Sequence, residues 1–153
     1  MTDTIKHYTA SVLIISDGQP AKALLTHHRK FDKWMPAGGH QEPWENPIET
    51  AIRETKEETG IDVSNVMPAP ILFDAVTQQI PPPNYFLEEE IPSFGDKPLH
   101  YHLDHIYVVK LPEQIARHDQ KESHAVKWFT LEQTESLPTF ENVHKILRQE
   151  LKS

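Results

Sequence analysis

Three glutamates within a span of five residues are the part of this sequence best suited to chemistry. Glu54, Glu57 and Glu58 are spaced i, i+3 and i+4, so on a helix their side chains would project from neighbouring positions. Like charges at this spacing destabilise a bare helix, whereas a hard divalent cation would reverse that effect. Because Mg²⁺ prefers oxygen ligands and is often completed by substrate phosphates, the pattern indicates metal-assisted phosphoryl or pyrophosphate chemistry.

Local signals predict a helix over residues 46–59 that would carry these glutamates. Asn46 is a good N-cap, Pro47 is a good first helical residue, and Glu49 lies three residues after the cap as in a capping box. Gly60 is a natural C-terminal stop. Apolar or β-branched residues at helical spacing form the expected inner face, namely Ile48, Ala51, Ile52, Thr55 and Thr59.

The rest of the chain predicts a mixed β-sheet between helical layers, an α/β (α+β) architecture in a single domain over residues 1–153. The expected strands cover residues 8–16, 22–26, 67–77, 99–111 and 125–131. A glycine-containing loop is expected at the end of residues 31–39, and a closing helix over residues 140–151. The proline-rich and acidic residues 80–98 are expected to form a long loop.

Composition excludes several classes of function. The chain has 23 acidic and 15 basic residues and a formal net charge of −8, which argues against binding a nucleic-acid polymer. It has no cysteine, which excludes disulfides, zinc–thiolate sites and cysteine nucleophiles. The polar N-terminal residues 1–7 lack the layout of a signal peptide, and no apolar run could span a membrane. We therefore expect a soluble, cytoplasmic protein.

A longer pattern that contains the glutamates resembles the Nudix box, Gly-x5-Glu-x7-Arg-Glu-U-x-Glu-Glu-x-Gly-U, where U is aliphatic. The pattern begins at Gly39 and ends at Ile61, and every fixed position matches. Thr55 occupies the first aliphatic position. Trp44, just before Glu45, is larger than the small residue often found at its own position in the family. The resemblance implies a Nudix-type α/β/α sandwich.

The resemblance also implies roles for individual residues. Mg²⁺, or alternatively Mn²⁺, would be bound by Glu54, Glu57, Glu58 and the carbonyl of Gly38. A water activated by the metal would attack one phosphorus of a nucleoside diphosphate linked to another moiety. Glu54 or Glu58 would accept the proton from that water.

Two further residues of the box, Arg53 and Glu45, are implied to form a pair that orients the glutamates. A surface salt bridge of little energetic value is the alternative. Outside the box, Glu122 lies six residues before Trp128 and resembles an additional catalytic or metal-binding glutamate found in some family members. It is a third candidate for the base, and a solvated loop acid is the alternative.

Histidines and basic residues are candidates for substrate contact. On a strand, His100, His102 and Asp104 would share a face and His105 would point the other way. This group could bind zinc or form a polar sheet face, but we favour a substrate-binding wall. Arg29 belongs to a basic run, residues 27–30, that either meets substrate phosphates or forms a solvated turn.

Three alternatives to a hydrolase stay open from the sequence. They are an isomerase on the same fold, a non-catalytic nucleotide-binding or regulatory domain, and a histidine-based zinc protein. The expected partner is a small nucleoside diphosphate derivative, with neither a nucleic-acid polymer nor a membrane. A homodimer is also considered, since many relatives pair.

Overall fold

The computed structural model describes residues 4–152 of the chain, so residues 1–3 and 153 of the predicted domain, and the first residues of the predicted polar N-terminal segment, lie outside it. Nine strands and three helices follow one another along the described chain. In order they are β1 (Lys6–Ser16), β2 (Lys22–His28), β3 (Lys33–Met35), β4 (Ala37–His40), α1 (Pro47–Thr59), β5 (Ile71–Asp74), β6 (Thr77–Gln79), β7 (Tyr85–Ile91), β8 (His100–Leu111), β9 (Ser123–Thr130), α2 (Leu131–Glu135) and α3 (Glu141–Glu150).

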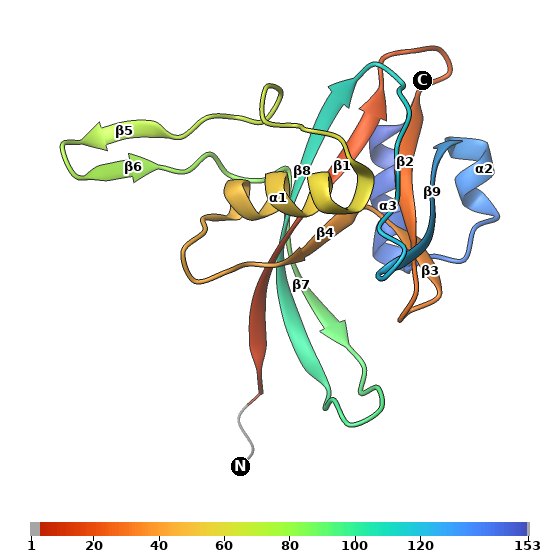
Figure 1. Ribbon diagram of the computed structural model, residues 1–153, viewed down its shortest axis with the longest axis horizontal. Coiled ribbons are helices and arrows are strands. Elements are labelled where there is room, and N and C mark those ends of the chain that lie inside the picture. Colours follow the sequence, from red (N-terminus) through yellow and green to blue (C-terminus); the bar gives the residue numbers. More distant parts are fainter. Residues whose placement is uncertain (1–3, 153) are drawn as a thin grey trace.

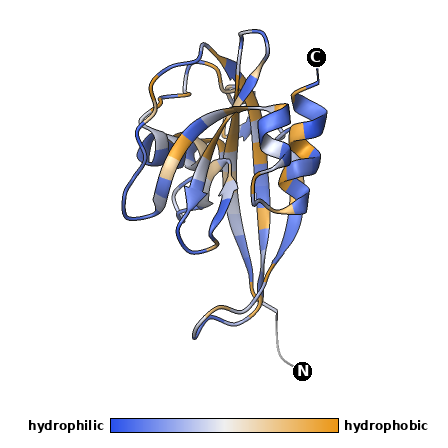
Figure 2. Cartoon of the chain, turned by 90° about the vertical axis from the view of Figure 1, so that its right-hand side faces the viewer, coloured by the Kyte–Doolittle hydropathy of each residue, from blue (hydrophilic) through white to orange (hydrophobic). Residues whose placement is uncertain are grey.

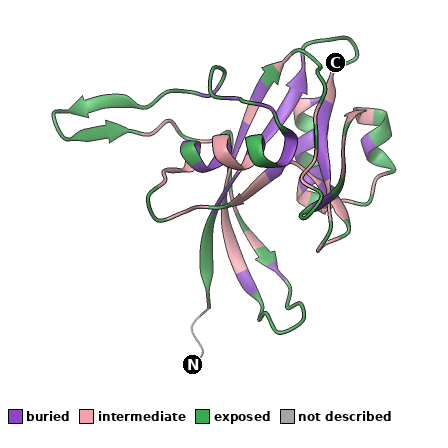
Figure 3. Cartoon of the chain, in the orientation of Figure 1, coloured by how far each residue is buried: buried purple, intermediate pink, exposed green. Residues whose placement is uncertain are grey.

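The main sheet is mixed, as predicted. Its path is β3-β2-β1-β8-β7, with β4 also paired to β1 and β9 also paired to β2. Strands β1 and β8 run parallel from the pair Lys6–Tyr101 to the pair Ser16–Leu111, and the remaining pairings are antiparallel. Strands β5 and β6 form a separate hairpin that extends away from the sheet and is exposed (Figure 3).

Alternating residues of β1 build a core on each side of the sheet. Val12 and Ile14 pack in one buried cluster with Ala51 of α1, whereas Leu13 packs in a second cluster with Leu147 of α3. Figure 1 shows α1 in front of the sheet and α3 behind it, and the hydrophobic residues follow the strands between the helices (Figure 2). This period-two alternation confirms the predicted α/β/α sandwich.

The structure confirms the helix predicted around the glutamates. The Asn46 side chain accepts a hydrogen bond from the Glu49 amide at 2.9 Å, and the Glu49 carboxylate accepts one from the Asn46 amide at 3.0 Å. Gly60 ends the helix at φ 76°, a left-handed conformation that favours glycine, and its N–H donates to the Lys56 carbonyl. These local hydrogen bonds fix where α1 starts and stops.

Several predicted loops and strands were wrong. Residues 80–98 are not one loop, because they contain β7, an edge strand that pairs with β8 along its whole length. Residues 31–39 contain the short strands β3 and β4, and the single strand expected over residues 67–77 is replaced by the β5–β6 hairpin. Helix α2 was not predicted. Within the described residues, no helix is long and apolar enough to cross a membrane.

Candidate functional site

Three carboxylates meet where α1 faces the loop before β9. Glu54 and Glu58 lie one turn apart on α1, and Glu122 directly precedes β9. One carboxylate oxygen from each lies within 4.8 Å of the others. The Glu122 carbonyl accepts a 2.9 Å hydrogen bond from the Arg29 amide at the end of β2. The backbone therefore holds this glutamate opposite the helix.

Two glycines of β4 let the strand approach the carboxylates closely. The Gly38 amide donates a 2.7 Å hydrogen bond to Glu58 Oε2. A Cβ added at Gly39 would lie 2.5 Å from the carboxyl carbon of Glu54, and one added at Gly38 would lie 2.6 Å from the Ala10 carbonyl oxygen. A side chain at Gly38 would collide with the backbone of β1, whereas one at Gly39 would displace the Glu54 carboxylate.

Arg53 links two glutamates of the box, Glu45 and Glu54. Its Nε and Nη2 donate to the two oxygens of Glu45 at 2.6 and 3.0 Å, and its Nη1 donates to Glu54 Oε1 at 2.9 Å. Nη2 also donates to the His40 carbonyl at 3.1 Å. The hydrogen bonds from Arg53 lower the pKa of Glu45 to about 2. A planar, multi-donor guanidinium can make all these contacts at once, so the side chain fixes the direction of Glu54.

Glu57 lies apart from the other two glutamates of the box. Its side chain is 55% exposed, and its nearest cation is Arg53 Nη1, at 3.4 Å. The carboxylate cluster therefore contains Glu122 where the sequence suggested Glu57. Whether Glu57 also ligates a metal stays a prediction.

The charge balance of the cluster fits a divalent cation. Glu58 is only 3% exposed, and burial, together with the nearby Glu54 and Glu122, raises its pKa to about 9. Burial also raises the pKa of Glu54. Three hard oxygen donors that repel one another, one of them forced to hold a proton, are a ligand set suited to Mg²⁺ or Mn²⁺.

The cluster opens into a pocket of about 950 Å³. Its walls come from β1, β2, β4, α1, β7, β8 and α3. The predicted substrate-binding residues all line it, namely Arg29, His100, His102 and Asp104. Glu54, Glu58, Glu122 and Gly38 also line the pocket, whereas Glu45, Arg53 and Glu57 do not. Acidic and basic side chains thus line the same pocket.

The predicted alternation along β8 is confirmed. His100, His102 and Asp104 face the pocket, whereas His105 stacks on Phe86 with ring centroids 4.5 Å apart. Asp104 is buried and accepts hydrogen bonds from Thr9 Oγ1 at 3.0 Å and from a second hydroxyl of β1 at 3.1 Å. The two hydrogen bonds hold this carboxyl in the pocket wall. Burial raises the pKa of Asp104.

Two histidines in the pocket wall were missed by the sequence reasoning. His7 of β1 and His40 of β4 lie beside His102, although 33 and 62 residues of chain separate consecutive members of the trio. Only the strand register brings them together, since His7 pairs with His102 and Thr9 pairs with His40. No local pattern in the sequence could have shown this.

Aromatic residues between β6 and β8 make different contacts. The Tyr85 hydroxyl donates to the Glu150 carboxylate at 2.7 Å, which anchors β7 to α3. Phe94 is 57% exposed, and Lys30 Nζ lies 5.6 Å from its ring centroid. On β9, Trp128 packs partly buried against the core, and its Nε1 donates to the Gln114 carbonyl.

A protein-family model and individual relatives both match this chain. The family model of the NUDIX domain matches residues 5–151. The bis(5'-nucleosyl)-tetraphosphatase (asymmetrical) of Mus musculus is 58% identical over 33 residues, which is 22% of this chain and 22% of that protein. The protein of the same name from Sus scrofa is 27% identical over 126 residues, 82% of this chain and 75% of that one.

A solved structure shares the fold over nearly its whole length. The crystal structure of a NUDIX-family hydrolase from Clostridium perfringens superposes with a TM-score of 0.71 and 27% sequence identity, and covers 95% of each chain. Together with the family model, which spans far more than half of the sequence, this likeness confirms the resemblance seen in the box. The chain belongs to the Nudix family.

Proposed function

We propose that this protein is a divalent-metal-dependent hydrolase that cleaves a diphosphate bond in a nucleoside diphosphate linked to another moiety. The observation that carries the proposal is the meeting of Glu54, Glu58 and Glu122 at the wall of an enclosed pocket that also holds cationic side chains. The relatives named above are tetraphosphatases of dinucleosides, so a dinucleoside tetraphosphate belongs to the proposed substrate class.

Glu54, Glu58 and Glu122 would hold Mg²⁺, or Mn²⁺ in its place, and the Gly38 carbonyl is proposed as a further ligand. When bound, the ion lowers the pKa of a coordinated water and offsets charge that develops on phosphate oxygens. Arg53 fixes Glu54 through its 2.9 Å hydrogen bond and keeps one face of that carboxylate directed at the site. The same three glutamates are the candidates for the base that accepts the water proton.

Cationic side chains of the same pocket would bind the substrate's phosphates. Arg29, Lys30 and Lys121 line the pocket, and charged donors of this kind suit phosphate oxygens. Arg29 Nε donates to the Gln120 carbonyl at 2.7 Å, which leaves its terminal nitrogens for the substrate. His100 and His102 supply imidazole nitrogens for hydrogen bonds to the linked group. The proposed partner is a small molecule; a nucleic-acid polymer is not expected.

A substrate screen tests this proposal directly. Untagged protein is incubated with nucleoside diphosphate derivatives, among them a dinucleoside tetraphosphate, with Mg²⁺, with Mn²⁺ or with excess chelator. Phosphate is measured after coupling to a phosphatase. We expect metal-dependent turnover of at least one compound, and its loss in Glu58→Gln with the fold retained. Turnover that is unchanged in the chelator, or in Glu58→Gln, would contradict the assignment.

The same reaction separates the alternatives. In ¹⁸O-labelled water a hydrolase places one label on a phosphate of the product, which mass spectrometry detects. An isomerase would return a product of unchanged mass without label, and a nucleotide sensor would bind its ligand without any product. The complete set of box glutamates in this chain favours hydrolysis.

A further inference from the structure

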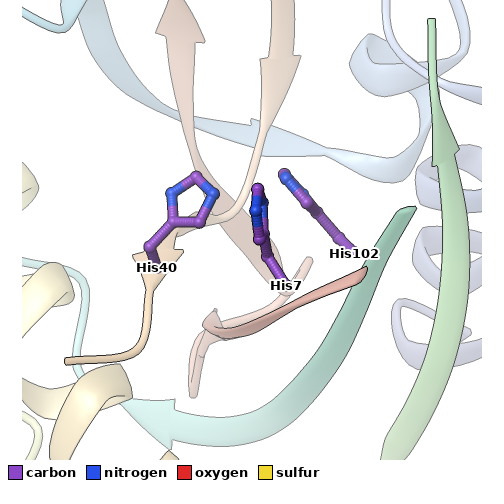
Figure 4. A group of neighbouring side chains, drawn as sticks. All are labelled: His7, His40 and His102. Atoms are coloured by element: carbon purple, nitrogen blue, oxygen red, sulfur yellow. The ribbon is translucent and has the colours of Figure 1, made fainter. Parts of the chain in front are cut away.

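Four imidazoles gather in the wall of the pocket that also contains the carboxylate cluster. His7, His40 and His102 each offer a ring nitrogen within 4.8 Å of the other two, and Figure 4 shows the three rings side by side. His100 lies against them, with its ring centroid 5.2 Å from that of His7 and 5.1 Å from that of His102. The group combines side chains from β1, β4 and β8.

The backbone places these rings with little freedom. His7 and His102 are paired residues of the parallel strands β1 and β8, and His40 pairs with Thr9 on the other side of β1. Residues 7 and 9 share a face of β1, so all three side chains emerge on the same face of one continuous sheet. A site built on three paired strands is more rigid than one built on loops.

The contacts of His100 resemble those of a metal-binding imidazole. Its Nδ1 lies 3.0 Å from the Pro98 carbonyl oxygen, which can only accept, so Nδ1 donates and Nε2 is turned toward the other rings. That Nε2 forms a 3.3 Å hydrogen-bond contact with Nε2 of His102. Tetrahedral zinc with bonds of about 2.0–2.1 Å to nitrogen places neighbouring ligand nitrogens about 3.3–3.4 Å apart. The two rings are therefore already as close as two ligands of one ion would be.

The donor atoms indicate which kind of ion would bind. His7, His40 and His102 offer only imidazole nitrogens. Such nitrogens suit a borderline transition metal, whereas a hard ion such as Mg²⁺ prefers oxygen ligands.

We propose that His7, His40 and His102 bind a first-row transition metal ion, with Zn²⁺ as the expected ion and His100 as the adjacent fourth imidazole. The rings of His7 and His40 are exposed, and ring nitrogens within 4.8 Å of one another need to approach by up to about 1.5 Å to reach ligand spacing. Its ligands are not the three glutamates, but both groups line one pocket, so a bound zinc ion and the substrate's linked group would compete for His102.

The histidine site is connected to the carboxylates through the backbone. His40 directly follows Gly39, and its carbonyl accepts the 3.1 Å hydrogen bond from Arg53. An ion bound to His40 would therefore restrain the end of β4, where the His40 carbonyl accepts the hydrogen bond from Arg53. It would also join β1, β4 and β8 at the rim of the pocket and oppose their separation on unfolding.

Zinc binding to untagged protein, stripped of metal by a chelator, tests the proposal. Competition with a chromophoric zinc chelator gives the affinity, and the visible spectrum of the Co²⁺ form reports tetrahedral nitrogen ligation. We expect one ion per chain and a rise in the unfolding temperature. Affinity should fall at least about tenfold in His7→Ala, His40→Ala and His102→Ala. His124→Ala, which removes an exposed histidine of β9, is the matched control and should bind normally.

Further variants keep the two metal sites apart. Glu58→Gln should leave zinc affinity and the Co²⁺ spectrum unchanged, because its carboxylate belongs to the other cluster. If a His→Ala variant fails to fold by circular dichroism, the His→Asn variant at the same position replaces it. Zinc binding that is no tighter in the wild type than in His7→Ala overturns the proposal. Stabilisation by inorganic phosphate, lost in the histidine variants and accompanied by no zinc binding, overturns it in favour of an anion site.

Discussion

Replacing Glu58 with glutamine should stabilise the metal-free protein, although it removes a residue of the proposed active site. Glu58 is 3% exposed, accepts a hydrogen bond from the Gly38 amide, and has a pKa raised to about 9 by burial and by neighbouring carboxylates. Glutamine preserves the shape and the accepting oxygen, and its NH₂ group can donate to the neighbouring acids. The substitution therefore removes a charge that the fold disfavours.

The size of this effect follows from proton linkage. Between the ordinary pKa of 4.5 and the raised value of about 9, the folded state holds a proton on Glu58 that the unfolded state has lost. The stability of the metal-free protein therefore falls as pH rises through this window. At pH 7 the loss is about 3 kcal/mol, the 2.5 pH units above 4.5 taken at about 1.36 kcal/mol each. Glu58→Gln, which cannot ionise, should recover about 2–3 kcal/mol.

Urea unfolding of both proteins in excess chelator, at pH 5, 6, 7 and 8, measures the difference. The stability advantage of Glu58→Gln should be small at pH 5 and grow with pH, and it should shrink when Mg²⁺ is added, since only the wild type gains from the ion. Glu132→Gln, at an exposed glutamate of α2 outside the carboxylate cluster, is the matched control and should not gain stability as pH rises. A Glu58→Gln variant less stable than the wild type at pH 7 in chelator would refute the reasoning.

The same proton should govern metal affinity. Because an ion must displace the proton from Glu58, the affinity of the wild type for Mg²⁺ should rise by about tenfold per pH unit between pH 6 and 8. Isothermal titration in buffers of different ionisation enthalpy counts the released proton. An affinity that does not change with pH, or binding without proton release, would contradict this account.

Three other substitutions test single contacts. Arg53→Lys cannot serve both oxygens of Glu45 and also Glu54, so activity should fall about 10–100-fold and the unfolding temperature should drop. Gly39→Ala places a methyl 2.5 Å from the Glu54 carboxyl carbon and should weaken Mg²⁺ binding about tenfold with the fold retained, as titration would show. Thr55→Val should stabilise the protein by about 1 kcal/mol at unchanged activity, because the buried Thr55 hydroxyl has no hydrogen-bond partner among the described residues. A destabilised Thr55→Val, a fully active Arg53→Lys, or a Gly39→Ala variant with normal metal affinity would each contradict the contact concerned.

Features that depend on a few neighbouring residues could be predicted from the sequence. Helix α1 is delimited by Asn46 and Gly60, whose hydrogen bonds reach only three or four residues along the chain. The two-sided core follows from the unbroken apolar run of β1, and the facing of His100 and His102 follows from strand alternation. Family membership was evident from residues 39–61 alone and is confirmed by the comparisons.

Features that depend on the pairing of distant segments could not be predicted from the sequence. Strand β7 carries Glu88 and Glu90 on its exposed side, which suits a sheet edge but reads as a solvated loop in sequence. The resemblance singled out Glu122 as a candidate, but its place beside Glu54 and Glu58 depends on the turn before β9, which is held by Arg29, a contact 93 residues distant. The histidine trio depends on the register of three strands. A cytoplasmic location and a homodimer stay predictions.

The proposed site requires the carboxylates of Glu54, Glu58 and Glu122 to share one divalent ion where a diphosphate can reach it. A crystal grown with Mn²⁺ and a non-cleavable nucleotide, measured at the manganese absorption edge, tests this most directly. We expect an anomalous peak bonded to Glu54 and Glu58, with Glu122 beside it and a phosphate oxygen completing the coordination. Carboxylates that point apart with no peak between them, while the nucleotide is bound elsewhere, would contradict it.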